Sequence, residues 1–296
     1  MLITVFTPTY NRAHLLPRLY ESLCQQTFKD FEWVVVDDGS VDGTKRLSLF
    51  LPQREGTFFP IRYFYQENGG KHRAINRGVK EANGELFLIL DSDDTLPPHS
   101  LEIINRYYQQ IKDDMSFGGV CGYMAHHDGT IIGHGCDVQI LDANSIDLRF
   151  KYHVQGDMLE VFRTTVMRDY PFPEIDGEKF VSEALVWNRI ARKYLLRVFH
   201  EVVYFRDYID GGLTDKIVKI RMNSPIASMM TYAELNKYRI PFVFKVKAAI
   251  NYWRFRYCYK KNEVNEKIKI PLIAAIWWVI APVGYLMHLN DNRKNK

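Results

Sequence analysis

Short apolar runs alternate with amphipathic segments along the first third of the chain. Glycine, proline, asparagine or aspartate bounds each run, which is typical of buried strands, and the segments between them have apolar residues at helical spacing. We therefore predict four strands and three helices, the strands at 2–6, 31–36, 61–66 and 86–90 and the helices at 15–26, 42–50 and 72–82. This alternation indicates an α/β fold whose mainly parallel sheet has helices on both faces.

Polar residues follow each predicted strand, at the edge of the sheet where ligands bind in such folds. Tyr10 follows the first strand and offers a flat face to a base. Asp38 follows the second, where its carboxylate accepts the imide N–H of uracil or thymine, caps a helix, or does both. Lys71 and Arg73 follow the third strand behind a glycine turn and suit a pyrophosphate.

Three carboxylates, those of Asp91, Asp93 and Asp94, follow the fourth strand. Clustered carboxylates repel one another unless a cation neutralises them, and Mg²⁺ or Mn²⁺ prefers such oxygen ligands. We expect a metal-phosphate site here. The alternative is a solvated acidic turn that caps a helix starting near Pro97 and Pro98.

Residues 119–137 have the pattern of a hairpin that turns at Asp128 and Gly129. We expect its three histidines to be packed or solvated rather than zinc ligands.

Composition places the chain among folded proteins, because 47% of its 296 residues are hydrophobic. We expect one large domain, or one domain with an appendage. The four cysteines form no C-x-x-C pair, which favours a reducing compartment. The first residues lack a basic flank and a cleavable apolar core, so we expect no signal peptide and a cytoplasmic catalytic body.

The C-terminal part differs in charge, with 13 Lys or Arg against three Asp or Glu from Lys237 onward. Its interleaved aromatics suit an anionic membrane or nucleic acid, and the uncharged stretch 270–289 decides for the membrane. Prolines interrupt this stretch and basic residues flank both ends, which favours a re-entrant or interfacial segment over a full span. The alternative is a helix packed on its own domain. We expect residues 245–289 to contact a membrane surface, and we expect no nucleic-acid partner.

Four motifs resemble the family 2 inverting glycosyltransferases with the GT-A fold. They are TPTYNR at 7–12, VVVDDGSVDGT at 34–44, NRG at 76–78 and LDSDD at 90–94. The resemblance is close over the first third and looser to about Tyr208. It implies a nucleotide-sugar donor, Mg²⁺ or Mn²⁺ at the D-x-D motif, and inversion at the anomeric carbon.

The resemblance also implies a role for individual residues. Tyr10 and Asp38 would hold the base, Asp91 the ribose or the metal, and Asp93 the metal between the diphosphate oxygens. Many relatives have Ala-Arg-Asn where this chain has Ala-Ile-Asn at 74–76, so we expect a nearby cation to replace the missing arginine. The expected donor-binding residues are Pro8, Thr9, Tyr10, Asn11, Arg12, Asp38, Lys71, Arg73, Asp91 and Ser92.

The reaction also needs a base, because the attacking hydroxyl must lose its proton. The family's Glu-Asp pair, followed by Trp and Arg, maps its catalytic base onto Glu183. Glu178 and Asp176 are alternatives, and Glu183 could instead be a polar residue at the start of a helix running to Tyr194.

Together these features predict a GT-A domain at 1–215 and a helical, membrane-associating extension at 216–296. The expected enzyme moves a sugar, from a UDP-sugar by preference, to a glycan or lipid-linked acceptor for cell-surface polysaccharide, at the inner face of the cell membrane. Two alternatives stay open. One is a haloacid-dehalogenase-like phosphatase with Asp91 as nucleophile, and the other is a noncatalytic nucleotide-sugar-binding module.

Overall fold

The computed structural model describes residues 1–47, 58–135, 138–206, 216–261 and 269–294. The chain forms two compact units, and both are discontinuous in sequence. The first unit comprises residues 1–171 and 190–207, and the second comprises 172–189 and 208–296. Residues 172–189, which we expected in the transferase domain, therefore group with the C-terminal helices; the domain division at 215/216 stays a prediction.

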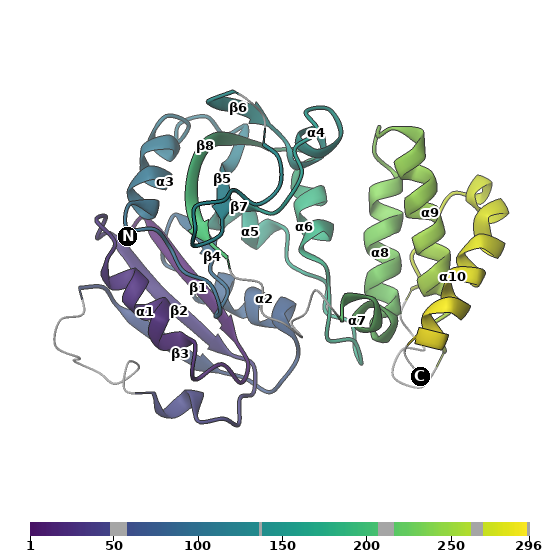
Figure 1. The fold of residues 1–296 in the computed structure, drawn as a ribbon, viewed down its shortest axis with the longest axis horizontal. Helices are drawn as coiled ribbons and strands as arrows, with labels where there is room; N and C mark the ends of the chain where they lie inside the picture. Colours follow the sequence, from purple (N-terminus) through teal and green to yellow (C-terminus); the bar gives the residue numbers. More distant parts are fainter. Residues whose placement is uncertain (48–57, 136–137, 207–215, 262–268, 295–296) are drawn as a thin grey trace. The chain divides into compact units, whose positions relative to one another are not determined.

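Four parallel strands form one half of the sheet in the first unit (Figure 1). Their order is β3-β2-β1-β4, and they span Ile3–Thr9 (β1), Phe31–Asp37 (β2), Ile61–Tyr65 (β3) and Leu86–Ile89 (β4). These are the four strands that the hydrophobic pattern predicts. Because all four run in the same direction, the loops that follow them lie at one edge of the sheet.

The other half of the sheet is mixed. Next to β4 lies β7, which is antiparallel to both β4 and β5. β8 is parallel to β5, and β6 is antiparallel to β8 at the edge. These strands span Phe117–Ala125 (β5), Ile140–Ala143 (β6), Met158–Arg163 (β7) and Leu195–Phe205 (β8).

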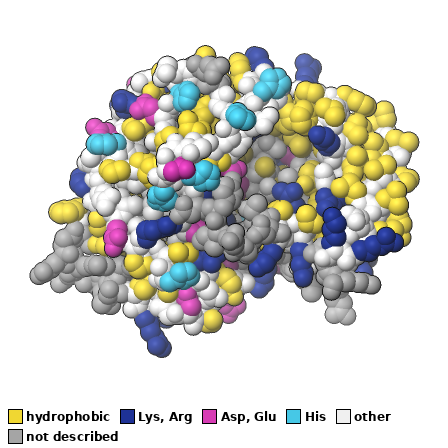
Figure 2. Space-filling view, in the orientation of Figure 1, with side chains coloured by type: hydrophobic (Ala, Val, Ile, Leu, Met, Phe, Trp, Pro, Cys, Tyr) yellow, Lys and Arg dark blue, Asp and Glu magenta, His cyan; other side chains and the backbone are white. Residues whose placement is uncertain are grey.

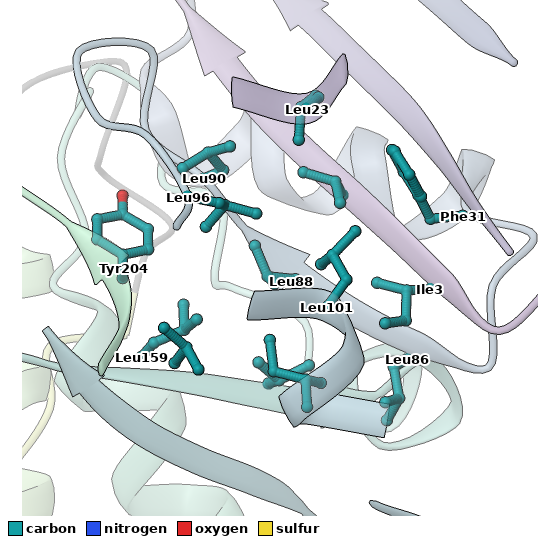
Figure 3. Close-up of a cluster of buried hydrophobic side chains, with 14 of the residues drawn as sticks. Ile3, Leu23, Phe31, Leu86, Leu88, Leu90, Leu96, Leu101, Leu159 and Tyr204 are labelled. Carbon is teal, nitrogen blue, oxygen red and sulfur yellow. The ribbon is translucent and has the colours of Figure 1, made fainter. Parts of the chain in front are cut away.

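Helices cover both faces of this sheet. The apolar sides of α1 (Leu16–Cys24) and α3 (Ser100–Gln109) pack on alternate residues of the strands in one buried cluster (Figure 3). On the opposite face, α2 (Lys71–Glu81) packs on β1 and β2 and contacts α5 (Thr164–Asp169). Gly78 allows α2 to lie this close, because a Cβ there would be 2.2 Å from the Phe6 ring.

Two local predictions differ from the structure. In place of a helix at 42–50 there is one 3₁₀ turn, η1 (Thr44–Arg46), and residues 48–50 lie outside the described part of the chain. Of the expected hairpin, β5 and the turn at 126–130 form. In the described part of the returning arm, Ile131 forms an isolated bridge with Ala125, and His134 forms one with Gln155 in place of β5. The helix α4 (Ser145–Phe150) follows β6.

The second unit is helical. Its helices are α6 (Glu183–Ile190), whose last residue belongs to the first unit, α7 (Ile217–Asn223), α8 (Pro225–Asn236), α9 (Phe242–Arg256), η3 (Ala275–Ile280) and α10 (Ala281–Lys294). α6 ends at Ile190 rather than at Tyr194, because residues 191–193 form a turn that leads into β8 at Leu195. Within the described ranges, no helix has both the length and the apolar character needed to cross a bilayer.

Candidate functional site

The loops that follow β1 and β2 are bonded to each other. The Asn11 amide donates to Ser40 Oγ at 2.8 Å, and the Val41 amide donates to Asn11 Oδ1 at 2.9 Å. Asn11 has φ of 54°, a left-handed conformation that asparagine tolerates better than most residues. Tyr10, beside it, is 50% exposed and so has a ring accessible for stacking. These two loops form one structured edge.

Asp37 closes the turn after β2. Its carboxylate accepts hydrogen bonds from the Ser40 amide at 2.7 Å and from the Tyr63 hydroxyl at 2.5 Å. Burial, and then the bond to Asp37, raise the pKa of Tyr63 far above its ordinary value, so this phenol stays a hydrogen-bond donor. Asp37 therefore shapes the turn that carries Asp38.

The Asp38 carboxylate is buried and accepts four hydrogen bonds from the segment between β3 and α2. Oδ1 accepts from Gln66 Nε2 at 2.8 Å and the Gly69 amide at 2.9 Å. Oδ2 accepts from Asn68 Nδ2 at 3.1 Å and the Gly70 amide at 2.7 Å. A carboxylate offers about four lone-pair sites, so these donors use them all. Asp38 thus holds the loop that precedes α2, while its contact with a base stays a prediction.

The same two loops approach each other closely along the backbone. Gly39 has φ of 89°, and a Cβ on it would lie 2.8 Å from the Asn68 amide nitrogen. Only glycine accommodates both conditions without movement of the loop. The turn after β2 and the loop before α2 are therefore one packed structure.

Lys71 opens α2 and points to the acidic turn. Its Nζ lies 2.6 Å from Asp91 Oδ1 and 2.8 Å from Oδ2. Both side chains are about one-third exposed, so the pair is accessible to solvent and to a ligand. Although β2 and β1 lie between β3 and β4 in the sheet, this ion pair joins the start of α2 to the turn that follows β4.

The acidic turn is anchored from β8. The Tyr204 hydroxyl donates to Asp94 Oδ2 at 2.7 Å and accepts from the Asp91 amide at 3.1 Å. Burial, and then the charge of Asp91, raise the pKa of Asp94 to about 7. On the other side, Arg18 Nη2 donates to the Asp93 carbonyl oxygen at 2.5 Å. The sequence pattern missed both supports; Tyr204 lies 110 residues after Asp94 and looks like an ordinary strand aromatic.

The donor set suits a divalent cation in its chemistry. Asp91 and Asp93 present partly exposed carboxylates from one turn, and the raised pKa of Asp94 reflects their combined negative charge as well as burial. Within the described residues, no three His, Cys, Asp or Glu side chains group as metal ligands, so further ligands would come from a bound diphosphate or water. Asp91 and Asp93 would hold the ion.

The remaining candidates also lie at this edge of the sheet. Pro8 and Thr9 are buried at the end of β1, and Arg12 is partly exposed in the loop that follows. Ser92 is 7% exposed within the acidic turn. Arg73 packs its side chain over Gly69, where a Cβ would lie 2.6 Å from Arg73 Cδ. All ten donor-binding candidates thus belong to the first unit.

Glu178 and Glu183, both in the second unit, occupy different environments. Glu178 is 6% exposed, and its carboxylate accepts from the Ile226 and Ala227 amides at 2.7 and 2.8 Å. It therefore caps the first turn of α8. Burial raises its pKa, and these two amide bonds partly offset the shift. Glu183 begins α6 and is partly exposed, which leaves it the better placed of the two to meet a substrate.

Comparison with known proteins places this chain in a family. The profile described as Glycosyl transferase family 2 matches residues 4–130. Glycosyltransferase GlyG of Streptococcus pneumoniae is 32% identical over 218 residues, which cover 70% of this chain and 68% of GlyG. The chain belongs to glycosyl transferase family 2.

Other relatives differ in length and coverage. The GalNAc(5)-diNAcBac-PP-undecaprenol beta-1,3-glucosyltransferase of Campylobacter jejuni is 27% identical over 98% of this chain and 97% of its own length. By contrast, the chain spans only 19% and 36% of the length of two uncharacterized glycosyltransferases, from Rickettsia conorii and Rickettsia typhi. It is 37% identical to the first over 124 residues, 40% of this chain, and 35% identical to the second over 126 residues, 41% of this chain.

Two solved structures share the fold. Staphylococcus aureus TarS 1–349 in complex with UDP has a TM-score of 0.60 and 20% identity, over 91% of this chain and 76% of that one. The mannosyltransferase PcManGT of Pyrobaculum calidifontis, in complex with GDP-Man and Mn²⁺, has a TM-score of 0.55 and 16% identity, over 98% and 87%. These likenesses confirm the predicted GT-A fold.

Proposed function

We propose that this protein is a metal-dependent inverting glycosyltransferase that moves a sugar from a nucleoside diphosphate, UDP by preference, to a glycan or lipid-linked acceptor. The observation that carries the proposal is the juxtaposition of Lys71 with the Asp91 carboxylate, at the edge where the loops after β1 to β4 meet. A family 2 chain with this edge has the groups that a sugar nucleotide needs.

The donor is bound by the loops of the first unit. Tyr10 stacks on the base, aided by Pro8, Thr9, Asn11 and Arg12, and the loop held by Asp38 brings Lys71 and Arg73 to the diphosphate. Ser92 and Asp91 complete the ribose and phosphate contacts. The complex of TarS with UDP supports uridine as the base.

Asp93 and Asp91 would hold Mg²⁺ or Mn²⁺. When bound, the ion supplies Lewis-acid stabilisation of the negative charge on the departing diphosphate. Lys71 shares the Asp91 carboxylate and adds a further positive charge at the same place. The Mn²⁺ and GDP-Man complex of PcManGT supports a metal-dependent donor site on this fold.

Glu183 accepts the proton of the attacking hydroxyl. A carboxylate in this role must reach the acceptor oxygen and must be ionised before the step. Glu178 is the weaker candidate, because two α8 amides already occupy its carboxylate and it is buried.

The acceptor is borne by the membrane. The name of the Campylobacter jejuni relative gives it a polyprenyl-diphosphate-linked acceptor, and the basic, apolar C-terminal extension at 216–296 of this chain suits a lipid surface. We place the protein in the cytoplasm, peripheral to the inner face of the cell membrane, with the catalytic domain at 1–215 and a role in cell-surface polysaccharide synthesis.

The test measures donor binding and donor hydrolysis separately, with UDP-, dTDP- and GDP-sugars in the presence of Mn²⁺. Wild type should hydrolyse a UDP-sugar slowly without an acceptor. Asp93→Asn should lose both thermal stabilisation by the donor and hydrolysis, by about 10²-fold or more. Glu183→Gln should retain binding and lose turnover by about 10²-fold or more.

Asp176→Asn tests the rival base, because Asp176 is exposed and lies in the loop before α6. If Asp176→Asn abolishes turnover and Glu183→Gln does not, the base is Asp176. Phosphate release from a generic ester, lost in Asp91→Asn, would replace the transferase with a phosphatase. Donor binding without any turnover would leave a binding module.

A further inference from the structure

The segment 271–294 is fixed on α9 by polar contacts along its inner side. Trp253 Nε1 donates to the Trp277 carbonyl at 2.9 Å, and the Tyr252 hydroxyl donates to the Pro271 carbonyl at 2.7 Å. Further along, Arg254 Nη2 donates to Asp291 Oδ1 at 2.7 Å. Because these three contacts hold one side of the segment 271–294 against α9, the opposite side of the segment faces away from α9. We call that opposite side the outer side.

Gly284 brings the two helices into close contact. A Cβ at this position would lie 2.5 Å from Trp253 Cβ and 3.0 Å from the Ile250 carbonyl oxygen. The inner side of α10 is therefore packed against α9, as the alternative of a helix packed on its own domain predicts. Packing on α9 does not explain why apolar side chains also cover the outer side of the segment.

The outer side is strongly apolar. Ile276, Val279, Val283 and Leu286 recur at intervals of three and four residues through η3 and α10, and they are 74%, 78%, 46% and 66% exposed. Such spacing puts them on one stripe. An isolated exposed apolar residue is ordinary, but a continuous stripe marks a contact surface.

The start of α9 lies beside η3 and bears three further exposed apolar side chains. The Phe242 ring lies 5.7 Å from the ring of Trp277, which is itself in η3, and Phe242 is 72% exposed. We call the whole surface the insertion face. It consists of Phe242, Val243, Phe244, Leu272, Ile276, Trp278, Val279, Val283, Tyr285 and Leu286, all of which are exposed. Figure 2 shows hydrophobic side chains gathered over this part of the molecule, with Lys and Arg beside them.

Positive charge borders the insertion face at both ends. Lys247 lies over the Phe244 ring at 5.4 Å, and Arg293 and Lys294 end α10. Among the described residues from 237 onward, Asp291 is the only acid, and Arg254 pairs with it. The insertion face is therefore apolar at its centre and cationic at its rim, with tryptophan and tyrosine among its members.

This distribution matches an anionic bilayer. Acyl chains receive aliphatic side chains, the headgroup level suits tryptophan and tyrosine, and anionic headgroups attract lysine and arginine. A protein partner would need a complementary acidic rim of its own, whereas an anionic bilayer supplies negative charge in every orientation around the rim.

We propose that the insertion face lies in the boundary between headgroups and acyl chains of an anionic bilayer. Phe242, Val243 and Phe244 then contact the membrane although they precede the 245–289 stretch expected from the sequence. Most of α9 does not contact the membrane itself and instead packs beneath the insertion face. The proposal rests on the proposed function only in its choice of a membrane-borne acceptor.

The test is flotation of the full chain with two kinds of vesicle, one of phosphatidylcholine alone and one that also contains about 30% phosphatidylglycerol. The second kind supplies the anionic headgroups that a basic rim should attract. Wild type should float with the anionic vesicles, and Trp fluorescence should shift to the blue. Ile276→Ser/Val279→Ser should lower binding at least about tenfold, because two apolar side chains leave the acyl region. Arg293→Gln/Lys294→Gln should weaken binding to the anionic vesicles only.

Met115→Ser/Phe58→Ser is the control, since these two exposed apolar residues, 69% and 68% accessible, lie in the first unit. It should float like wild type. Equal flotation of the Ile276→Ser/Val279→Ser variant would overturn the proposal. A second result would also overturn it: wild type that does not bind vesicles but self-associates in light scattering, with the self-association lost in the Ile276→Ser/Val279→Ser variant. The partner of the insertion face would then be a second copy of the chain.

Donor hydrolysis in solution separates this proposal from the proposed function. The Ile276→Ser/Val279→Ser variant should hydrolyse the UDP-sugar as wild type does. Flotation without any hydrolysis by wild type would overturn the proposed function and leave the insertion face in place. Hydrolysis by wild type without flotation would overturn the insertion face and leave the proposed function in place.

Discussion

In the first unit, the carboxylates at the strand ends are held by hydrogen bonds from neighbouring loops, and Asp38 alone accepts four. In the second unit, the helices α9 and α10 are held by a buried ion pair between Arg254 and Asp291 and by aromatic contacts. The first arrangement spreads the cost of burying a charge over many donors. The second places a cation directly against a buried carboxylate, so the loss of that cation alone should do more harm there.

The largest effect is expected for Arg254→Ala. Arg254 and Asp291 have side chains only 14% and 7% exposed, so the substitution leaves the Asp291 carboxylate buried without its cation. We expect the free energy of unfolding of the second unit to fall by about 3–5 kcal/mol. Urea denaturation followed by tryptophan fluorescence measures it, because Trp253 of α9 packs against Trp278 of η3 and against Gly284 of α10.

Lys260→Ala is the control for this substitution, since Lys260 is exposed beyond the end of α9. It should change the stability by less than about 0.5 kcal/mol. If Arg254→Ala were as mild as the control, the ion pair would not be what holds α10 on α9.

A smaller effect is expected for Asp38→Asn. Whichever way the amide is oriented, its NH₂ group faces two of the four donors, so two hydrogen bonds are lost. We expect a loss of about 1–3 kcal/mol in stability. Because the loop before α2 carries Lys71, the KM for the donor should rise about tenfold or more, while kcat changes little.

Asp30→Asn makes the same chemical change at a carboxylate that is 60% exposed. Chemical denaturation and donor kinetics of the two variants should therefore differ clearly. An Asp38→Asn variant with an unchanged KM but a changed preference among bases would instead assign Asp38 to base recognition.

The smallest effect is expected for Glu178→Gln. The folded-state pKa of Glu178 is raised from 4.5, so the folded state binds this proton more tightly than the unfolded state does. The resulting stabilisation is full below about pH 4.5 and is lost as the pH rises through the folded-state pKa. Glu178→Gln should remove this dependence, with a change of about 1 kcal/mol or less near pH 7. Thermal unfolding from pH 4 to pH 7 compares it with wild type, and an unchanged pH profile would exclude this carboxyl as its source.

The sequence predicted the strands in the first half of the sheet well, because β1 to β4 are apolar runs bounded by turn residues. It did not predict their order, in which β2 and β1 lie between β3 and β4. It did not predict the antiparallel insertion of β7 between β4 and β5. That placement depends on long-range pairing and on Arg163, a buried residue whose guanidinium donates to the carbonyls of Phe117 and Ile111. No local pattern distinguishes such an arginine from an exposed one.

The candidate site was predicted in part for the same reason. Asp38, Lys71 and the acidic turn follow strands, and strand ends can be read from a hydrophobic pattern. The hydrogen bonds that Tyr204 and Arg18 make to the acidic turn could not be predicted in this way, because each joins residues 75 or more positions apart.

The sharing of the Asp38 carboxylate among Gln66, Asn68, Gly69 and Gly70 constrains how donor choice can be altered. Under the proposed function, exchanging Asp38 to change the nucleotide preference would also loosen the segment that carries Lys71. A change of nucleotide preference should therefore succeed only when residues 38 and 66–70 are redesigned together as one unit.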